Sequence, residues 1–146
     1  MGSGLGDIAD EYCDFAIDYA DIPNFSKLNL EGHKGRLVFA KINGKKVVMM
    51  QGRFHYYDGY SMAEVTYPIK IFKLLGVKQI ILTNAAGAVN KTFKPADLMV
   101  ITNHINFMGT NPLIGKIDER FAYYRDVSFQ NFLDEFNLTS IKRENP

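Results

Sequence analysis

Cysteine, tryptophan and long apolar runs are scarce in this sequence. Its 146 residues include one cysteine, Cys13, and no tryptophan. A lone cysteine cannot form an internal disulfide, which favours a reducing compartment, and no metal-ligand spacing surrounds Cys13. We therefore expect an ordinary thiol there, and no cluster of cysteine and histidine predicts a metal site. No apolar run approaches the roughly 18 residues that a membrane helix needs.

Net charge is also nearly absent. The 17 basic and 16 acidic side chains leave a formal charge of +1, so no strong global field draws the chain to nucleic acid or to a membrane. No basic stripe with interleaved aromatic residues indicates nucleic-acid binding either. Hydrophobic residues make up 47% and charged residues 23%, which is typical of a globular protein, and the length predicts one domain. The acidic, glycine-rich start does not resemble a signal peptide, so we expect the cytoplasm.

The clearest local pattern is a hairpin in the middle of the chain. Two apolar runs, residues 37–42 and 46–50, flank Asn43 and Gly44. Asn-Gly between apolar runs is the strongest short hairpin signal, because both turn positions accept a positive φ.

A helix is predicted to follow, beginning at Ser61. Ser61 and Glu64 have the spacing of a capping box, and apolar residues recur at helical intervals up to Leu75. Gly76 lies where a left-handed C-terminal cap is favoured. Pro68 falls inside this span, so we expect a kink or a first turn separated from the rest.

Further elements complete the expected fold. Val77–Thr83 reads as a buried strand that ends at Asn84–Gly87, Leu98–Thr102 as another strand, and residues 129–136 as a short amphipathic helix. This order of elements predicts an α/β fold in which helices flank a mixed β-sheet.

Chemistry-bearing side chains gather directly after the second run of the hairpin. Arg53, His55, Tyr57 and Asp58 follow the apolar residues 47–50. In an extended chain Arg53 and His55 project from the same face. Arg53 suits a forked contact to a phosphate or carboxylate, although a surface ion pair uses the same residue type. Tyr57 and Asp58 suit sugar hydroxyls or support of a histidine, while a hydrogen-bonded structural role explains His55 equally well.

Two glycine-rich segments provide further candidates. Residues 2–6, with Ser3, can wrap an oxyanion with backbone amides, but they match neither phosphate-binding glycine motif, and a flexible terminus has the same composition. His33 lies between Gly32 and Gly35, where a sharp loop can present an imidazole, although a solvated histidine is the commoner case. His104 has no paired ligand nearby and reads as structural.

The small residues Asn84–Gly87 end a predicted buried strand. Ligands in α/β folds bind at such strand ends, and small residues allow close approach to the backbone. Tight helix packing would select the same residues, so the pattern alone leaves both interpretations open.

Taken together, these segments resemble the trimeric purine nucleoside phosphorylases. The matching runs are residues 32–39, 50–60, 83–87 and 111–115, nearly collinear from Gly2 to about Phe121. The resemblance implies a purine-nucleoside phosphorylase, a pentosyltransferase that cleaves purine (deoxy)ribonucleosides with inorganic phosphate to the free base and (deoxy)ribose 1-phosphate. It implies no metal or organic cofactor, phosphate being a co-substrate, and a homotrimer of complete chains.

The resemblance also implies roles for particular residues. The phosphate-binding set is Ser3, His33, Arg53, Phe54, His55 and Ala85, the last through its backbone amide. His55 and Asp58 form the catalytic pair, in which the carboxylate orients the imidazole, where the family often has glutamate. Tyr57 contacts the sugar, and Phe121 closes the sugar side of a neighbouring subunit's site.

The family is nearly twice as long as this chain, so we expect a partial phosphorylase domain. Residues 1–121 are family-like and 122–146 form a divergent tail, with an N-terminal strand and the C-terminal half, which carries the purine-reading residues, absent. Two rival hypotheses remain: a catalytically inactive remnant that docks into family trimers, and a phosphorylase of the methylthioadenosine type.

Overall fold

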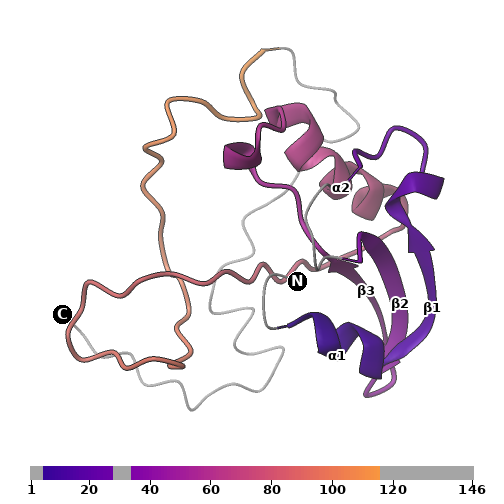
Figure 1. The fold of residues 1–146 in the computed structure, drawn as a ribbon, viewed down its shortest axis with the longest axis horizontal. Helices are drawn as coiled ribbons and strands as arrows, with labels where there is room; N and C mark the ends of the chain where they lie inside the picture. Colours follow the sequence, from indigo (N-terminus) through magenta and orange to yellow (C-terminus); the bar gives the residue numbers. More distant parts are fainter. Residues whose placement is uncertain (1–4, 28–33, 116–146) are drawn as a thin grey trace. The chain divides into compact units, whose positions relative to one another are not determined.

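The computed structural model of the protein describes residues 5–27 and 34–115, in two units, residues 1–93 and 94–146. Every helix and strand of the described residues lies in the first unit (Figure 1). In chain order they are α1 (Gly6–Glu11), β1 (Cys13–Asp18), the 3-10 turn η1 (Tyr19–Asp21), β2 (Arg36–Ile42), β3 (Lys45–Gln51), the 3-10 turn η2 (Tyr56–Asp58) and α2 (Met62–Leu74). Neither helix of this described part has the length and hydropathy needed to span a membrane.

The predicted hairpin is confirmed as β2 and β3. These strands pair antiparallel, with Ile42 opposite Lys45 across the turn. Asn43 and Gly44 both adopt a positive φ, 49° and 78°, as a two-residue turn that matches the twist of the strands requires. The Asn-Gly pair therefore fixes the register of the sheet.

A third strand, β1, was not predicted. It pairs antiparallel with β2, with an irregularity between Cys13 and Phe15, and gives the sheet order β1-β2-β3. Phe15 stacks on Phe39 of β2 with ring centroids 4.5 Å apart. All pairings among the described strands are antiparallel, so the parallel part of the expected mixed sheet does not occur in the described residues.

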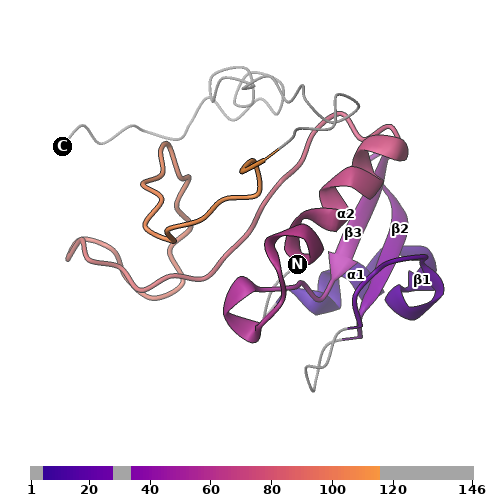
Figure 2. The same ribbon diagram turned by 90° about the horizontal axis from the view of Figure 1, so that it is seen from above.

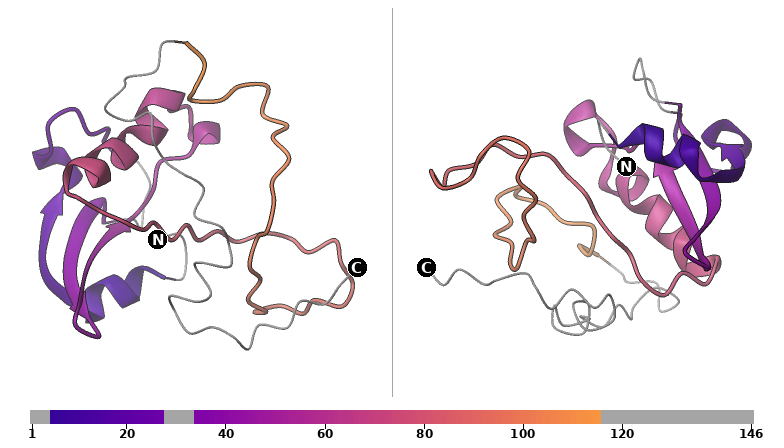
Figure 3. Two further views of the ribbon diagram at one scale, coloured as in Figure 1. Left: turned by 180° about the vertical axis from the view of Figure 1, so that it is seen from behind. Right: turned by 90° about the horizontal axis from the view of Figure 1, so that it is seen from below.

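The two faces of the sheet build two separate cores, since successive side chains of a strand point to opposite faces. Leu37 packs in a cluster that residues of α2 join, whereas its neighbour Val38 packs in a cluster with Ala9 of α1. The views from above, behind and below show α2 and α1 against the sheet (Figures 2 and 3). The apolar run of β2 is thus covered on both faces, by α2 on one and by α1 on the other.

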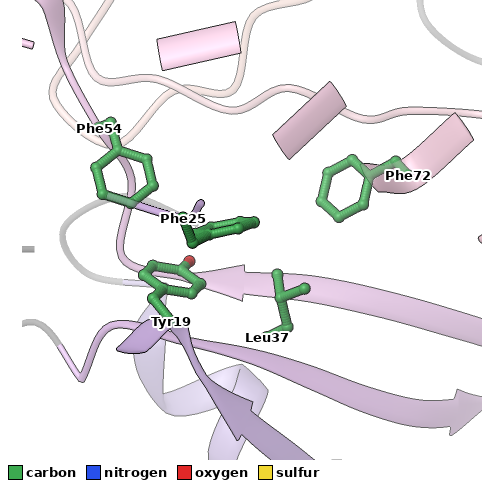
Figure 4. Close-up of a cluster of buried hydrophobic side chains, with 5 residues drawn as sticks. All are labelled: Tyr19, Phe25, Leu37, Phe54 and Phe72. Carbon is green, nitrogen blue, oxygen red and sulfur yellow. The ribbon is translucent and has the colours of Figure 1, made fainter. Parts of the chain in front are cut away.

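Aromatic rings dominate the core on the α2 face. This cluster consists of five buried side chains: Tyr19, Phe25, Leu37, Phe54 and Phe72 (Figure 4). The Tyr19 hydroxyl donates a hydrogen bond to the Gly52 carbonyl at 2.6 Å, and burial raises the pKa of Tyr19 far above its ordinary value. The hydroxyl therefore stays protonated and ties η1 to the residue that follows β3.

Helix α2 begins and ends where the sequence predicts. Ser61 and Glu64 form both bonds of the capping box, and Gly76 has φ 78° and donates its N–H to the Lys73 carbonyl at 3.1 Å. The expected separation of the first turn is wrong, because the helix runs unbroken through the buried Pro68. The cap at Ser61 and the packing of Val65 on the core hold the first turn in place.

The two later strands predicted from apolar runs do not form. In residues 77–83 only Val77, Ile80 and Thr83 are partly buried, while Leu82 is 74% exposed, and Leu98 in the second unit is fully exposed. A strand requires a neighbour to accept its backbone bonds, and no described strand pairs with either segment. The predicted helix at 129–136 and the tail from 122 lie outside the described residues.

Candidate functional site

The candidate site lies directly after β3, where the backbone bends at Gly52. Gly52 is buried and has φ 102°, a region that favours glycine. Phe54 then inserts into the aromatic core with 2% of its surface exposed. His55 has extended dihedrals, φ −120° and ψ 142°, so alternation places the half-buried Arg53 and His55 opposite to Phe54. The core thereby orients the two polar side chains together.

Arg53 connects this segment to the next candidate segment of the chain. Its Nη1 atom donates to the Thr83 carbonyl at 2.6 Å. Thr83 is followed by Asn84 and Ala85, so the guanidinium lies near the backbone of the segment predicted to hold a ligand. The guanidinium has five N–H donors and this bond uses one of them, which leaves a permanent cation with capacity for an anion.

His55 and Tyr57 lie together on the outer side of the same segment. Their rings stack at 4.7 Å between centroids, with an interplanar angle of 12°, and Tyr57 is 80% exposed. The 3-10 turn η2 folds the chain back, and the Asp58 N–H donates to the His55 carbonyl at 3.1 Å. Gly59 ends the turn with φ 90°. An aromatic face beside an imidazole suits a sugar ring that presents hydroxyl groups.

The structure places the remaining predicted site residues as follows. Ala85 is exposed in an irregular segment, and the buried Phe54 can reach a ligand only through its backbone. The Asp58 carboxylate is exposed, and its predicted action on His55 stays a prediction. Ser3, His33 and Phe121 lie outside the described residues.

Sequence reasoning missed a polar network at the end of β3. Gln51 is buried, with 4% of its surface exposed. Its Nε2 donates to the Gly6 carbonyl at 2.8 Å and to Asp10 Oδ2 at 3.0 Å, and its Oε1 accepts from Arg36 Nε at 2.7 Å. Asp10 also accepts from Arg36 Nη2 at 2.5 Å and from Lys34 Nζ at 2.8 Å. The sequence did contain a signal for this network, because the polar residue Gln51 directly follows the apolar run 47–50.

Because Asp10 is part of this network, we expect the stability of the fold to fall in acid. The hydrogen bond from Lys34, followed by that from Gln51, lowers the pKa of Asp10 below its ordinary value of 3.8, against a partial opposing effect of desolvation. A carboxyl with a depressed folded-state pKa stabilises the fold fully above its unfolded pKa, and the contribution is lost as the pH falls through the folded pKa. We expect Asp10→Asn to make the loss of stability below about pH 4 shallower, measured by urea unfolding at stepped pH. An acid profile identical to that of the unmodified chain would contradict the role of Asp10.

Metal chemistry receives no support from the described residues. Among residues 5–27 and 34–115, no group of three or more histidine, cysteine, aspartate or glutamate side chains could hold a metal ion.

The fold and this cluster define an α/β protein with a guanidinium, an imidazole and a phenol at the end of a strand. The chain belongs to the phosphorylase superfamily, whose family model matches residues 1–141. This confirms the resemblance and the fold class that the sequence predicted.

Named relatives are similar over most of this chain. It is 57% identical over 119 residues to purine nucleoside phosphorylase 1 of Geobacillus stearothermophilus, covering 81% of this chain and 43% of that protein. It is 48% identical over 144 residues to the purine nucleoside phosphorylase of Mus musculus, covering 90% of this chain and 50% of that protein. The chain thus spans about half the length of the curated relatives it matches.

One solved structure is likewise matched over about half of its own length. Isoform 2 of purine nucleoside phosphorylase from Schistosoma mansoni, in complex with cytosine and ribose-1-phosphate, superposes with a TM-score of 0.81 at 41% identity. The match covers 94% of this chain and 50% of that chain.

Proposed function

We propose that this chain acts as a purine nucleoside phosphorylase and that its described residues provide part of the phosphate site. The reaction is the phosphate-dependent cleavage of purine (deoxy)ribonucleosides to the free base and (deoxy)ribose 1-phosphate. The observation that carries the proposal is the 2.6 Å bond from Arg53 Nη1 to the Thr83 carbonyl. This bond joins the two segments, residues 50–60 and 83–87, whose sequences match the phosphorylases.

Phosphate needs a permanent cation and several donors, because it must stay charged while it acts as the nucleophile. In our proposal Arg53 supplies the cation and a forked contact. His55, Ser3 and His33 donate further bonds, together with the backbone amides of Ala85 and Phe54. The outward projection of Arg53 and His55 opposite to the buried Phe54 supports this arrangement.

The sugar would lie over Tyr57, which stacks against His55 and is well exposed, and Asp58 would orient the His55 imidazole. Phe121 of a neighbouring subunit would close the sugar side, which accords with a homotrimer. During the reaction the bond from the anomeric carbon to the base nitrogen breaks, and a bond from that carbon to a phosphate oxygen forms. The phosphate anion held beside the developing ribosyl cation stabilises it, and positioning supplies much of the rate.

The departing base keeps the electron pair of the broken bond and takes up a proton from solvent, so the proposed reaction uses phosphate as a co-substrate and no metal or organic cofactor. We also propose a cytoplasmic location, which the lone Cys13 supports because it indicates no structural disulfide. Nucleic acid and membranes are not partners in this proposal.

The test is a phosphorolysis assay on the purified chain. We expect hypoxanthine to be released from inosine only when phosphate is present, together with ribose 1-phosphate. Replacing phosphate by sulfate at equal ionic strength controls for salt. Base release independent of phosphate, or none at any phosphate concentration, would contradict the proposal, and turnover confined to methylthioadenosine would assign a different substrate.

A further inference from the structure

A hydrogen bond from the aromatic core holds the peptide unit that joins Gly52 to Arg53. The Tyr19 hydroxyl donates to the Gly52 carbonyl at 2.6 Å, and both residues are buried. Burial raises the pKa of Tyr19 far above its ordinary value, so the hydroxyl stays a donor. The Gly52 carbonyl and the Arg53 N–H belong to one planar unit. The core therefore fixes the backbone from which the Arg53 side chain extends.

The backbone at Gly52 would turn easily without this bond. Its φ of 102° favours glycine, and glycine is the residue with the greatest backbone freedom. A rotation of the peptide unit changes ψ of Gly52 and φ of Arg53 together. Removing the hydroxyl takes a donor from a buried carbonyl, which favours a backbone that reaches another donor. The direction of the Arg53 side chain would change with it.

Tyr19 is held in place by contacts other than this bond. Its N–H donates to the Gly35 carbonyl at 2.8 Å, and the Gly35 N–H donates to the Gln51 carbonyl at 3.0 Å. The Tyr19 ring packs on Phe25 and Phe54, with centroids 4.7 and 5.4 Å away (Figure 4). Backbone and ring thus place the hydroxyl at the end of β3.

The far end of the Arg53 side chain is held as well, since Nη1 donates to the Thr83 carbonyl at 2.6 Å. We infer that Tyr19 is a positioning residue for Arg53: its hydroxyl sets the Gly52–Arg53 peptide so that the guanidinium lies at Thr83 and meets an anion there. These four residues all lie in the first unit. That the anion is phosphate rests on the proposed function. The Tyr19 ring serves the core, whereas its hydroxyl serves the guanidinium.

Tyr19→Phe tests the hydroxyl alone, because the ring and its packing remain. Tyr67→Phe is the matched control. The Tyr67 ring packs against the same aromatic core, and its hydroxyl donates to the Pro23 carbonyl at 3.0 Å. This control removes a tyrosine hydroxyl whose bond does not reach the end of β3. Phe72→Leu is a second control, because it removes a buried ring of α2 and lowers the stability without removing a side-chain hydrogen bond.

The first measurement is the Nε–H signal of Arg53 in proton–nitrogen NMR spectra of the full chain without phosphate, assigned by its absence from the Arg53→Lys spectrum. We expect Tyr19→Phe to shift or broaden this signal, while both controls leave it in place. The second measurement is the Kd of inorganic phosphate by calorimetric titration, with the urea midpoint recorded for each variant. The Kd should rise about tenfold in Tyr19→Phe, the loss of about one well-placed contact, and stay unchanged in both controls.

An Arg53 signal or a phosphate Kd that is the same in Tyr19→Phe as in the unmodified chain would overturn the inference. A Kd that Phe72→Leu raises as much as Tyr19→Phe does would also overturn it, since lost stability alone would then explain the effect. Failure of the proposed function looks different, because the unmodified chain then neither binds phosphate nor responds to Arg53→Ala. In that case the Arg53 signal still decides whether the Tyr19 hydroxyl positions the side chain.

Discussion

Replacing Arg53 by alanine is expected to weaken phosphate binding by about 100-fold and to remove phosphorolysis. A charge-assisted hydrogen bond contributes about 1.5–3 kcal/mol, and a forked contact from one guanidinium forms two of them. Since each 1.4 kcal/mol is about tenfold in affinity, losing both hydrogen bonds of the fork should weaken phosphate binding by about 100-fold. The remaining donors cannot replace these two bonds. The measurement is phosphate titration alongside the initial rate of inosine cleavage at saturating nucleoside.

Two further substitutions decide whether the effect is specific to this cation. Arg53→Lys keeps the charge but offers a point contact instead of a planar fork, so it should recover only part of the affinity. Lys41→Ala removes an exposed cation from β2 of the same sheet and should leave both readouts unchanged. Equal losses in Lys41→Ala and Arg53→Ala would indicate a general charge effect and no phosphate site at Arg53.

Local signals in the sequence predicted the hairpin and α2 because each is determined by nearby residues. Asn43 and Gly44 impose a turn through their own dihedrals, and Ser61 with Glu64 caps a helix through bonds within one turn. Such elements require no partner from elsewhere in the chain. Pro68 shows the limit of such local signals. Packing on the core keeps α2 continuous at this residue, where helix propensity alone predicts a break.

The predicted strands at 77–83 and 98–102 failed for the opposite reason. Their apolar composition indicates burial, but a strand exists only when another strand accepts its backbone bonds, and none is described beside them. Conversely β1 was missed because its pattern is weak: Phe15 and Ile17 are both substantially exposed. The spacing of apolar residues indicates which face of an element is buried, but it does not indicate which other element covers that face.

The sequence predicted which residue types form the candidate site, but it did not predict the long-range hydrogen bonds around them. Arg53, His55 and Tyr57 stand together in the sequence, and the structure keeps them together on one segment. The approach of Thr83 to Arg53 and the bonds of Gln51 to Gly6 join positions 30 and 45 residues apart. Contacts of that range depend on how the sheet and helices pack, which no local motif encodes.

Phe54→Ala is expected to destabilise the fold by about 3–5 kcal/mol, the usual cost of truncating a buried phenylalanine. Phe54 contacts three other rings: Tyr19, Phe25 and Tyr60, with centroids 5.4, 5.8 and 5.1 Å away. Since a domain of this kind is stable by only about 5–15 kcal/mol, the variant should lose a large share of its folded population. Urea unfolding followed by circular dichroism measures the change.

The same substitution tests how the core orients the site. Phe54 lies between Arg53 and His55, so removing its ring frees the segment that alternation holds in place. Phosphate affinity should therefore fall even at temperatures where Phe54→Ala remains folded. Phe107→Ala is the control, because Phe107 is 90% exposed and its truncation leaves no cavity. If Phe54→Ala and Phe107→Ala cost the same stability, Phe54 does not anchor the strand end, and the outward placement of Arg53 and His55 needs another cause.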